Sequence, residues 1–76
     1  MKKINIKTEF ITLGQLLKIL DIVSSGGEAK FYIKEHKIFV NGTLEDRRGR
    51  KLRKGDLVVL SDLKILIDDQ NDDSKH

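Results

Sequence analysis

The sequence predicts a small α+β domain in which two short helices pack on a small, mainly antiparallel sheet with a β-hairpin. Residues 13–23 carry an apolar stripe with helical spacing, and residues 38–45 place β-favouring side chains around an Asn-Gly pair. The chain has 76 residues, which is room for one domain, and it contains no Cys and no Trp. Its core must therefore be held by packing alone, without disulfides or a zinc–thiolate site.

The first elements expected along the chain are a strand and a helix. Ile4 and Ile6 alternate with polar residues, which is the period of a half-buried strand. Thr12 and Gln15 have the spacing of a capping box, so we expect a helix to begin there. The apolar stripe that follows predicts that this helix continues to about Val23.

A second, shorter helix is expected after the break at residues 24–27. Ser25 and Glu28 repeat the spacing of a capping box. The face that should pack inward ends at His36, which we expect to be partly buried at the helix end; the other members of that face are Ala29, Tyr32 and Ile33. Three lysines fall on a neighbouring, more exposed strip: Lys30, Lys34 and Lys37.

The strongest local signal is a β-hairpin over residues 38–45. Asn41 and Gly42 tolerate the positive φ angles that a two-residue type I′ turn requires, and β-favouring residues flank them. The remaining elements expected are a charged loop at 46–51, a turn at 54–56, an interior strand at 57–60 and a final strand at 65–67.

The net charge of +3 averages over two different regions. Residues 68–76 hold four Asp against one Lys, a net charge of −3 with His neutral, so residues 1–67 carry +6. We expect a single domain at 1–67 and a disordered acidic tail at 68–76. The tail is either a solubilising segment or one that folds back and competes for the basic surface.

The positive charge is concentrated in residues 30–54, which hold nine basic side chains against three acidic ones. Six of these cations fall within residues 47–54. Clustered cations favour a polyanionic partner, because Arg bonds phosphate oxygens bidentately while Lys acts as a point charge. The alternative is an ordinary solvated loop. Ser25 and Gly26 add backbone N–H groups at a helix start, which bind a phosphate or simply form an interhelical turn.

The sequence offers little for catalysis. No Cys is present, and His36 and His76 are the two imidazoles, so a metal site or a nucleophile triad lacks members. Glu45 and Asp46 are adjacent at a strand end and should point to opposite faces, so we expect them to orient neighbouring arginines. We therefore predict no enzyme, no metal and no cofactor.

The amino-terminal residues 1–8 mix lysines with isolated apolar residues. A secretory signal or a membrane span needs an unbroken apolar run. We therefore expect a cytoplasmic protein that does not bind a membrane. We also expect it to be a monomer.

The order of the motifs resembles the S-four domain, an RNA-binding module named after a small-subunit ribosomal protein. The segments that carry the resemblance are Ser-Gly-Gly-Glu-Ala-Lys at 25–30, Lys-Ile-Phe-Val-Asn-Gly at 37–42, Arg-Arg-Gly-Arg-Lys-Leu at 47–52 and Lys-Gly-Asp at 54–56. The match spans residues 12–60 and is most similar to the stand-alone YaaA/YbcJ type. It implies an αL motif, in which two helices and a hairpin present a basic surface to structured RNA, often ribosomal.

The resemblance also implies which residues form that surface. One side would consist of Ser25, Gly26, Lys30 and Lys34, and the other of Asn41, Arg47, Arg48, Arg50 and Lys51. The charge pattern adds Lys37, Arg53 and Lys54.

The function expected from these features is non-catalytic binding of structured RNA, in particular ribosomal RNA during ribosome assembly or maintenance. Ribosomal particles are a further expected partner. Two alternatives remain at this point. One is a protein-interaction adaptor whose basic surface binds an acidic partner, and the other is a DNA-binding module, because phosphate contacts alone do not separate RNA from DNA.

Overall fold

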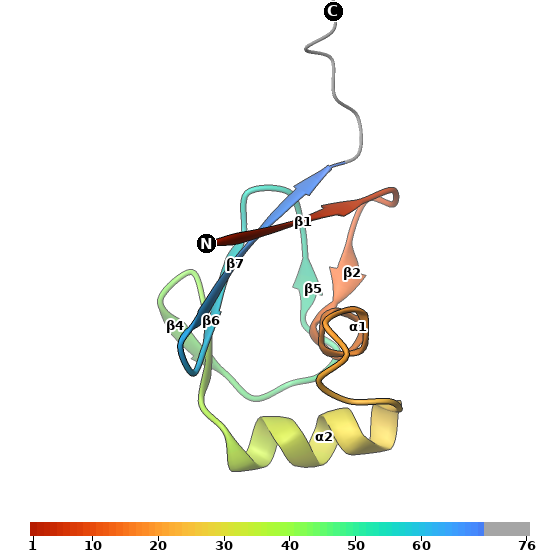
Figure 1. Ribbon diagram of the computed structural model, residues 1–76, viewed down its shortest axis with the longest axis vertical. Coiled ribbons are helices and arrows are strands. Elements are labelled where there is room, and N and C mark those ends of the chain that lie inside the picture. The colour runs from red at the N-terminus through yellow and green to blue at the C-terminus, as the bar shows by residue number, and fades with distance from the viewer. Residues whose placement is uncertain (70–76) are drawn as a thin grey trace, which may run out of the picture.

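The computed structural model describes residues 1–69, and the rest of the predicted acidic tail, residues 70–76, lies outside the described residues. Its elements in chain order are β1 (Lys2–Ile6), β2 (Ile11–Thr12), α1 (Leu13–Ile19), α2 (Gly26–Glu35), β3 (Ile38–Val40), β4 (Thr43–Glu45), β5 (Lys51–Leu52), β6 (Leu57–Leu60) and β7 (Leu63–Asp69). The predicted α+β class is confirmed. Figure 1 shows the two helices together at one end of the molecule, with the end of β7 at the other.

Five strands form one sheet in the order β1-β7-β6-β3-β4. β1 and β7 are parallel, and the other three pairs are antiparallel. β6 lies in the centre with Val58 and Leu60 buried, which confirms the prediction of an interior strand. The fully buried side chains of the sheet, such as Ile38 and Ile65, pack in one cluster with Leu13, Leu16 and Leu17 of α1.

A second, two-stranded ribbon was not predicted. β2 and β5 pair antiparallel, with Ile11 opposite Leu52 and Thr12 opposite Lys51. Each strand has two residues, which is too short for a period of two to be visible in the sequence. This ribbon joins the start of α1 to the charged residues 46–51, and it therefore helps to position the basic side chains.

Both predicted helix starts are confirmed. The Thr12 hydroxyl accepts from the Gln15 N–H at 3.1 Å, and the Thr12 N–H donates to Gln15 Oε1 at 2.8 Å, which completes a capping box. At α2 the Ser25 hydroxyl accepts from the Glu28 N–H at 3.1 Å. The Glu28 carboxylate, however, accepts from the N–H and the hydroxyl of Ser24, so the second capping box forms only in half.

Helix α1 ends at Ile19, four residues before the predicted end at Val23. Asp21 adopts a positive φ of 63°, and the Ile22 N–H donates to the Leu17 carbonyl at 3.0 Å. This pattern is a Schellman-type C-cap, which turns the chain out of the helix. Val23 lies in the loop after α1, and its side chain is buried there. The apolar stripe in the sequence therefore continues beyond the end of the helix.

The prediction that His36 is partly buried is wrong. His36 is exposed, and its ring stacks on that of Tyr32 with the centroids 4.0 Å apart. The backbone of His36 is extended, with φ of −126° and ψ of 146°. This change of backbone at the helix end takes His36 off the face that packs inward, although the sequence spacing places it there.

The hairpin of β3 and β4 is confirmed, with Val40 paired to Thr43. Asn41 and Gly42 have φ angles of 52° and 85°, as a type I′ turn requires. The last strand is longer than the predicted 65–67, because β7 also includes Asp68 and Asp69, which pair with residues of β1. A parallel neighbour thus extends the strand into residues whose polarity indicated a tail.

Candidate nucleic-acid interface

The arginine loop, residues 46–50, runs from β4 to β5 across the start of α1. The N–H groups of Leu13 and Gly14 donate to the carbonyls of Arg50 and Arg48 at 2.8 and 2.9 Å. The first N–H groups of a helix lack partners within the helix, so these two bonds attach the loop backbone to α1. A Cβ at Gly14 would lie 3.4 Å from the Arg48 carbonyl oxygen, and glycine therefore permits this close approach.

Glu45 is the buried anchor of the arginine loop, with 6% of its surface exposed. Its carboxylate accepts from Arg47 Nε at 2.8 Å, Arg47 Nη2 at 3.2 Å and Arg50 Nη1 at 3.1 Å. Hydrogen bonds from the Arg47 side chain lower the pKa of Glu45 to about 2, and Arg50 contributes in the same direction against the effect of burial. The prediction that Glu45 orients neighbouring arginines is confirmed.

The contacts of Glu45 divide the two arginines into different roles. Arg47 keeps 70% of its side-chain surface exposed, and three of the five N–H groups of its guanidinium point elsewhere than to Glu45. Arg50 is only 30% exposed and also donates to the Lys51 carbonyl. Arg47 therefore offers a free edge to a phosphate, whereas Arg50 is mainly directed inward.

The turn at residues 53–56 is organised by Asp56. One carboxylate oxygen of Asp56 accepts from the Arg53 N–H at 2.8 Å, and the other accepts from the Asn41 amide at 3.0 Å. The Asn41 side-chain oxygen in turn accepts from the Leu57 N–H at 2.9 Å. Asn41, expected on the RNA-binding surface, thus uses both ends of its amide to join the hairpin turn to the 53–56 turn.

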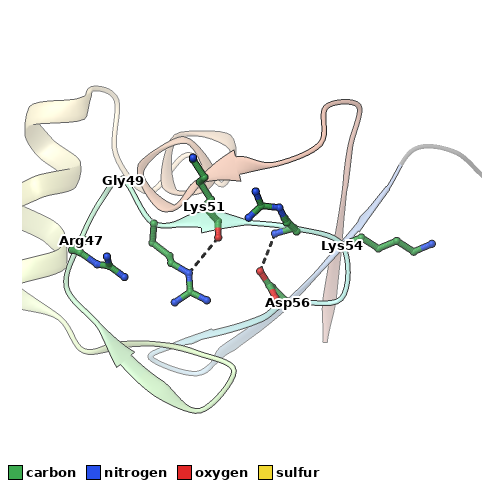
Figure 2. A pocket seen from close by; sticks show the side chains of 7 residues that line it. Arg47, Gly49, Lys51, Lys54 and Asp56 are labelled. Carbon is green, nitrogen blue, oxygen red and sulfur yellow. Dashed lines mark hydrogen bonds between the residues drawn. The ribbon is translucent and has the colours of Figure 1, made fainter.

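An open groove of ≈600 Å³ lies between the arginine loop and this turn. The residues that line the basic groove are Arg47, Gly49, Arg50, Lys51, Arg53, Lys54 and Asp56. Figure 2 shows Arg47 and Lys54 at opposite ends of it, with Lys51 between them. The structure therefore brings five of the predicted cationic residues to one hollow surface, where their potentials add.

Phe10 contacts two of these cations, a role that sequence reasoning missed. Lys51 Nζ lies 5.0 Å from the centre of the Phe10 ring, and Arg53 Cζ lies 5.4 Å from it. Both distances are within cation–π range. Phe10 precedes β2, and the β2–β5 register places it beside Arg53, so only that unpredicted pairing could have indicated the contact.

Arg48 connects the arginine loop to the start of α2. Its Nη1 donates to the Gly26 carbonyl at 2.7 Å, and a Cβ at Gly26 would lie 3.3 Å from the same nitrogen. The Ser25 hydroxyl caps α2 by accepting from the Glu28 N–H. Lys34 and Lys37 line a cleft of ≈330 Å³ between the end of α2 and β4.

Residues 4–68 match a family model described as S4 domain. The chain belongs to the S4 domain family. A protein of Bacillus subtilis (strain 168) named "Probable ribosome maturation protein RlbA" is 54% identical over 57 residues, which cover 75% of this chain and 80% of that protein. The resemblance read from the motifs is thereby confirmed, and the match extends beyond both ends of the predicted segment at 12–60.

The described part of this S4 domain comprises residues 1–69. Within that part, no group of three or more His, Cys, Asp or Glu residues is placed to hold a metal ion. Among the same residues, no helix is long and apolar enough to cross a membrane.

Proposed function

We propose that this S4 domain protein binds structured ribosomal RNA without catalysing a reaction, and that it acts in the cytoplasm as a monomer during ribosome assembly or maintenance. The observation that carries the proposal is the basic groove of ≈600 Å³, which is lined by five cationic residues. Membership of the S4 family and the name of the Bacillus relative support an RNA and ribosomal partner.

The proposed contacts follow from how each side chain is held. Arg47, Lys51 and Lys54 bind phosphates at the groove, because their side chains are exposed and their backbone is held in place. The Arg47 N–H donates to Glu45 Oε2 at 3.0 Å, Lys51 pairs in the β2–β5 ribbon, and Lys54 lies in the turn that Asp56 organises. The full set of proposed RNA-binding residues is Ser25, Gly26, Lys30, Lys34, Lys37, Arg47, Arg48, Arg50, Lys51, Arg53 and Lys54, with Asn41 as a positioning residue. Folded RNA is then selected by its shape and phosphate positions.

The test of this function is the salt dependence of binding to ribosomal RNA fragments. Each neutralised phosphate contributes about −0.9 to the logarithmic salt slope on a B-form duplex and about −0.7 on single strands. Contacts by the four exposed cations of the groove therefore predict a slope between about −3 and −4; these cations are Arg47, Lys51, Arg53 and Lys54. Affinity should fall about 100-fold between 50 and 200 mM salt. A flat response of a folded protein would contradict phosphate binding at the groove.

Two further experiments separate the proposal from its alternatives. Duplex DNA should compete poorly with structured ribosomal RNA; equal competition would favour the DNA-binding module. Partners captured from a lysate should be lost after ribonuclease treatment. Acidic proteins that remain bound to the protein after RNA is digested would favour the adaptor.

Asp69, at the end of β7, competes weakly with RNA for one cation of the basic groove. Its carboxylate lies 3.4 Å from Lys54 Nζ, and both side chains are partly exposed. We expect Asp69→Asn to free the Lys54 charge and to tighten binding of a ribosomal RNA fragment about twofold at low salt, with the gain lost at high salt. Fluorescence anisotropy measures the change.

Asp62→Asn is the matched control for Asp69→Asn. It makes the same change of charge at an exposed position in the turn between β6 and β7. Equal effects of the two variants would show that net charge, and not the contact with Lys54, is responsible.

A further inference from the structure

Phe31 is a large aromatic side chain on the outer side of α2, and 68% of its surface is exposed. The residues of α2 that are buried in the core are Ala29 and Ile33. At about 100° per residue, Phe31 lies roughly 160° around the helix from both of them. The core therefore gains nothing from this ring, and phenylalanine is not a strong helix former. Packing within the fold therefore does not explain this aromatic ring.

The ring lies at the margin of the basic surface. On one side of Phe31 the helix carries Lys30 and Lys34, both exposed. That side faces the arginine loop, because Arg48 binds the Gly26 carbonyl and Lys34 lines the cleft against β4. A polyanion that occupies the lysines of α2 must therefore pass beside the ring of Phe31.

The turn before Phe31 leaves its ring uncovered. Helical side chains lean toward the N-terminus, so the ring lies over the turn that contains Gly27 and Glu28. Gly27 has no side chain, and an added Cβ there would meet only the Ser25 hydroxyl oxygen, at 3.9 Å. The Glu28 carboxylate is held by Ser24 at 2.6 and 2.7 Å. An aromatic ring with an open face next to two lysines is thus presented to solvent.

We propose that Phe31 stacks on an unpaired nucleobase of the bound RNA, while Lys30 and Lys34 hold the phosphates next to that base. This inference rests on the proposed function and adds a class of target to it: RNA with a single-stranded loop or bulge beside a paired stem. A nucleotide matches the surface in both respects, because its base offers an aromatic face and its phosphate neutralises the lysines. An apolar protein surface would leave both lysines unpaired.

The test uses two RNAs and three variants. One RNA is a ribosomal hairpin with a single-stranded loop, and the other is the same stem as a fully paired duplex. Phe31→Ala should weaken binding of the hairpin by about 5- to 150-fold and leave the duplex within twofold. Phe31→Leu keeps an apolar side chain but has no aromatic face, and it should lose nearly as much affinity for the hairpin.

Phe31→Trp keeps the aromatic face and introduces the only tryptophan of the chain. It should retain the affinity of the wild type, and its fluorescence should be quenched by the hairpin and not by the duplex. Leu63→Ala, which trims another exposed apolar residue at the start of β7, serves as the matched control and should bind as the wild type does. Circular dichroism checks the fold of each variant.

The outcomes separate stacking from the function on which it rests. If Phe31→Ala and Phe31→Leu bind the hairpin as the wild type does, with a steep salt dependence, stacking is wrong and phosphate binding stands. If the Trp variant binds without quenching, stacking is also wrong. A third outcome is that Phe31→Ala keeps its RNA affinity but no longer captures a protein partner that the wild type retains after ribonuclease treatment. This result would overturn stacking in favour of a protein contact. If the wild type binds neither RNA, the proposed function itself fails.

Discussion

Replacing Lys51, Arg53 and Lys54 together by Glu is expected to weaken binding of a ribosomal RNA fragment by about 100-fold or more at physiological salt, because three charge-assisted contacts are lost and three repulsive ones replace them. These side chains line the basic groove and are exposed. Their side chains contact Phe10 and Asp69, which are themselves partly exposed. Their backbone is held independently of these contacts, because Lys51 pairs in the β2–β5 ribbon and the Arg53 N–H donates to Asp56. The fold should therefore survive the triple change.

This triple variant is a sharper test than reversal of the arginine loop. Arg47 and Arg50 donate to the buried Glu45, so Glu at either position would place a second carboxylate against the first and destabilise the fold. The matched control reverses three exposed lysines that do not line the groove: Lys2, Lys7 and Lys64. Fluorescence anisotropy measures affinity, and circular dichroism measures folding. A folded groove variant with wild-type affinity would refute RNA binding at this surface.

Glu45→Gln is expected to lower the free energy of unfolding by about 2 kcal/mol at pH 7, because a buried carboxylate with two arginine partners is lost. The effect stays below that of a fully buried ion pair, because Arg47 is 70% exposed and solvent screens it. Urea unfolding measures the difference. Asp46→Asn is the control: it removes an exposed carboxylate next in sequence and should change stability by less than about 0.5 kcal/mol.

The same carboxylate predicts a pH dependence of stability. The pKa of Glu45 is about 2 in the folded protein, against an ordinary value of 4.5. Its contribution is therefore complete above pH 4.5 and is lost as the pH falls toward 2. This pKa difference corresponds to about 3 kcal/mol. Because solvent screens the exposed Arg47, the wild type should lose about 2 kcal/mol more than Glu45→Gln over this window. Parallel stability curves for the two proteins below pH 4.5 would show that Glu45 is not held by the arginines.

Local chemistry explains most of what was predicted correctly. Helix starts depend on a few neighbouring residues, so Thr12 and Ser25 indicated them directly. The hairpin turn depends on the φ preferences of Asn41 and Gly42, and these are also local. The family could be identified from the spacing of its motifs, and the match over residues 4–68 confirms it.

The predictions that were wrong concern places where a distant segment or a single backbone angle determines the structure. Asp21 ends α1 through a positive φ, although the apolar period continues past it. His36 leaves the packed face because the chain becomes extended there. Asp68 and Asp69 belong to a strand because β1 pairs with them. None of these is visible in a pattern of apolar and polar residues.

The candidate site also has features that the sequence indicated and features that only the tertiary structure revealed. Residue identities alone indicated where the cations are concentrated and that Glu45 orients arginines, because charge and nearest-neighbour contacts are properties of a short segment. Only the tertiary structure decided which cations share a groove, that Asn41 is committed to internal bonds, and that Phe31 faces solvent. The physical reason is that these properties depend on segments far apart in sequence, such as β2 with β5 and the arginine loop with α1.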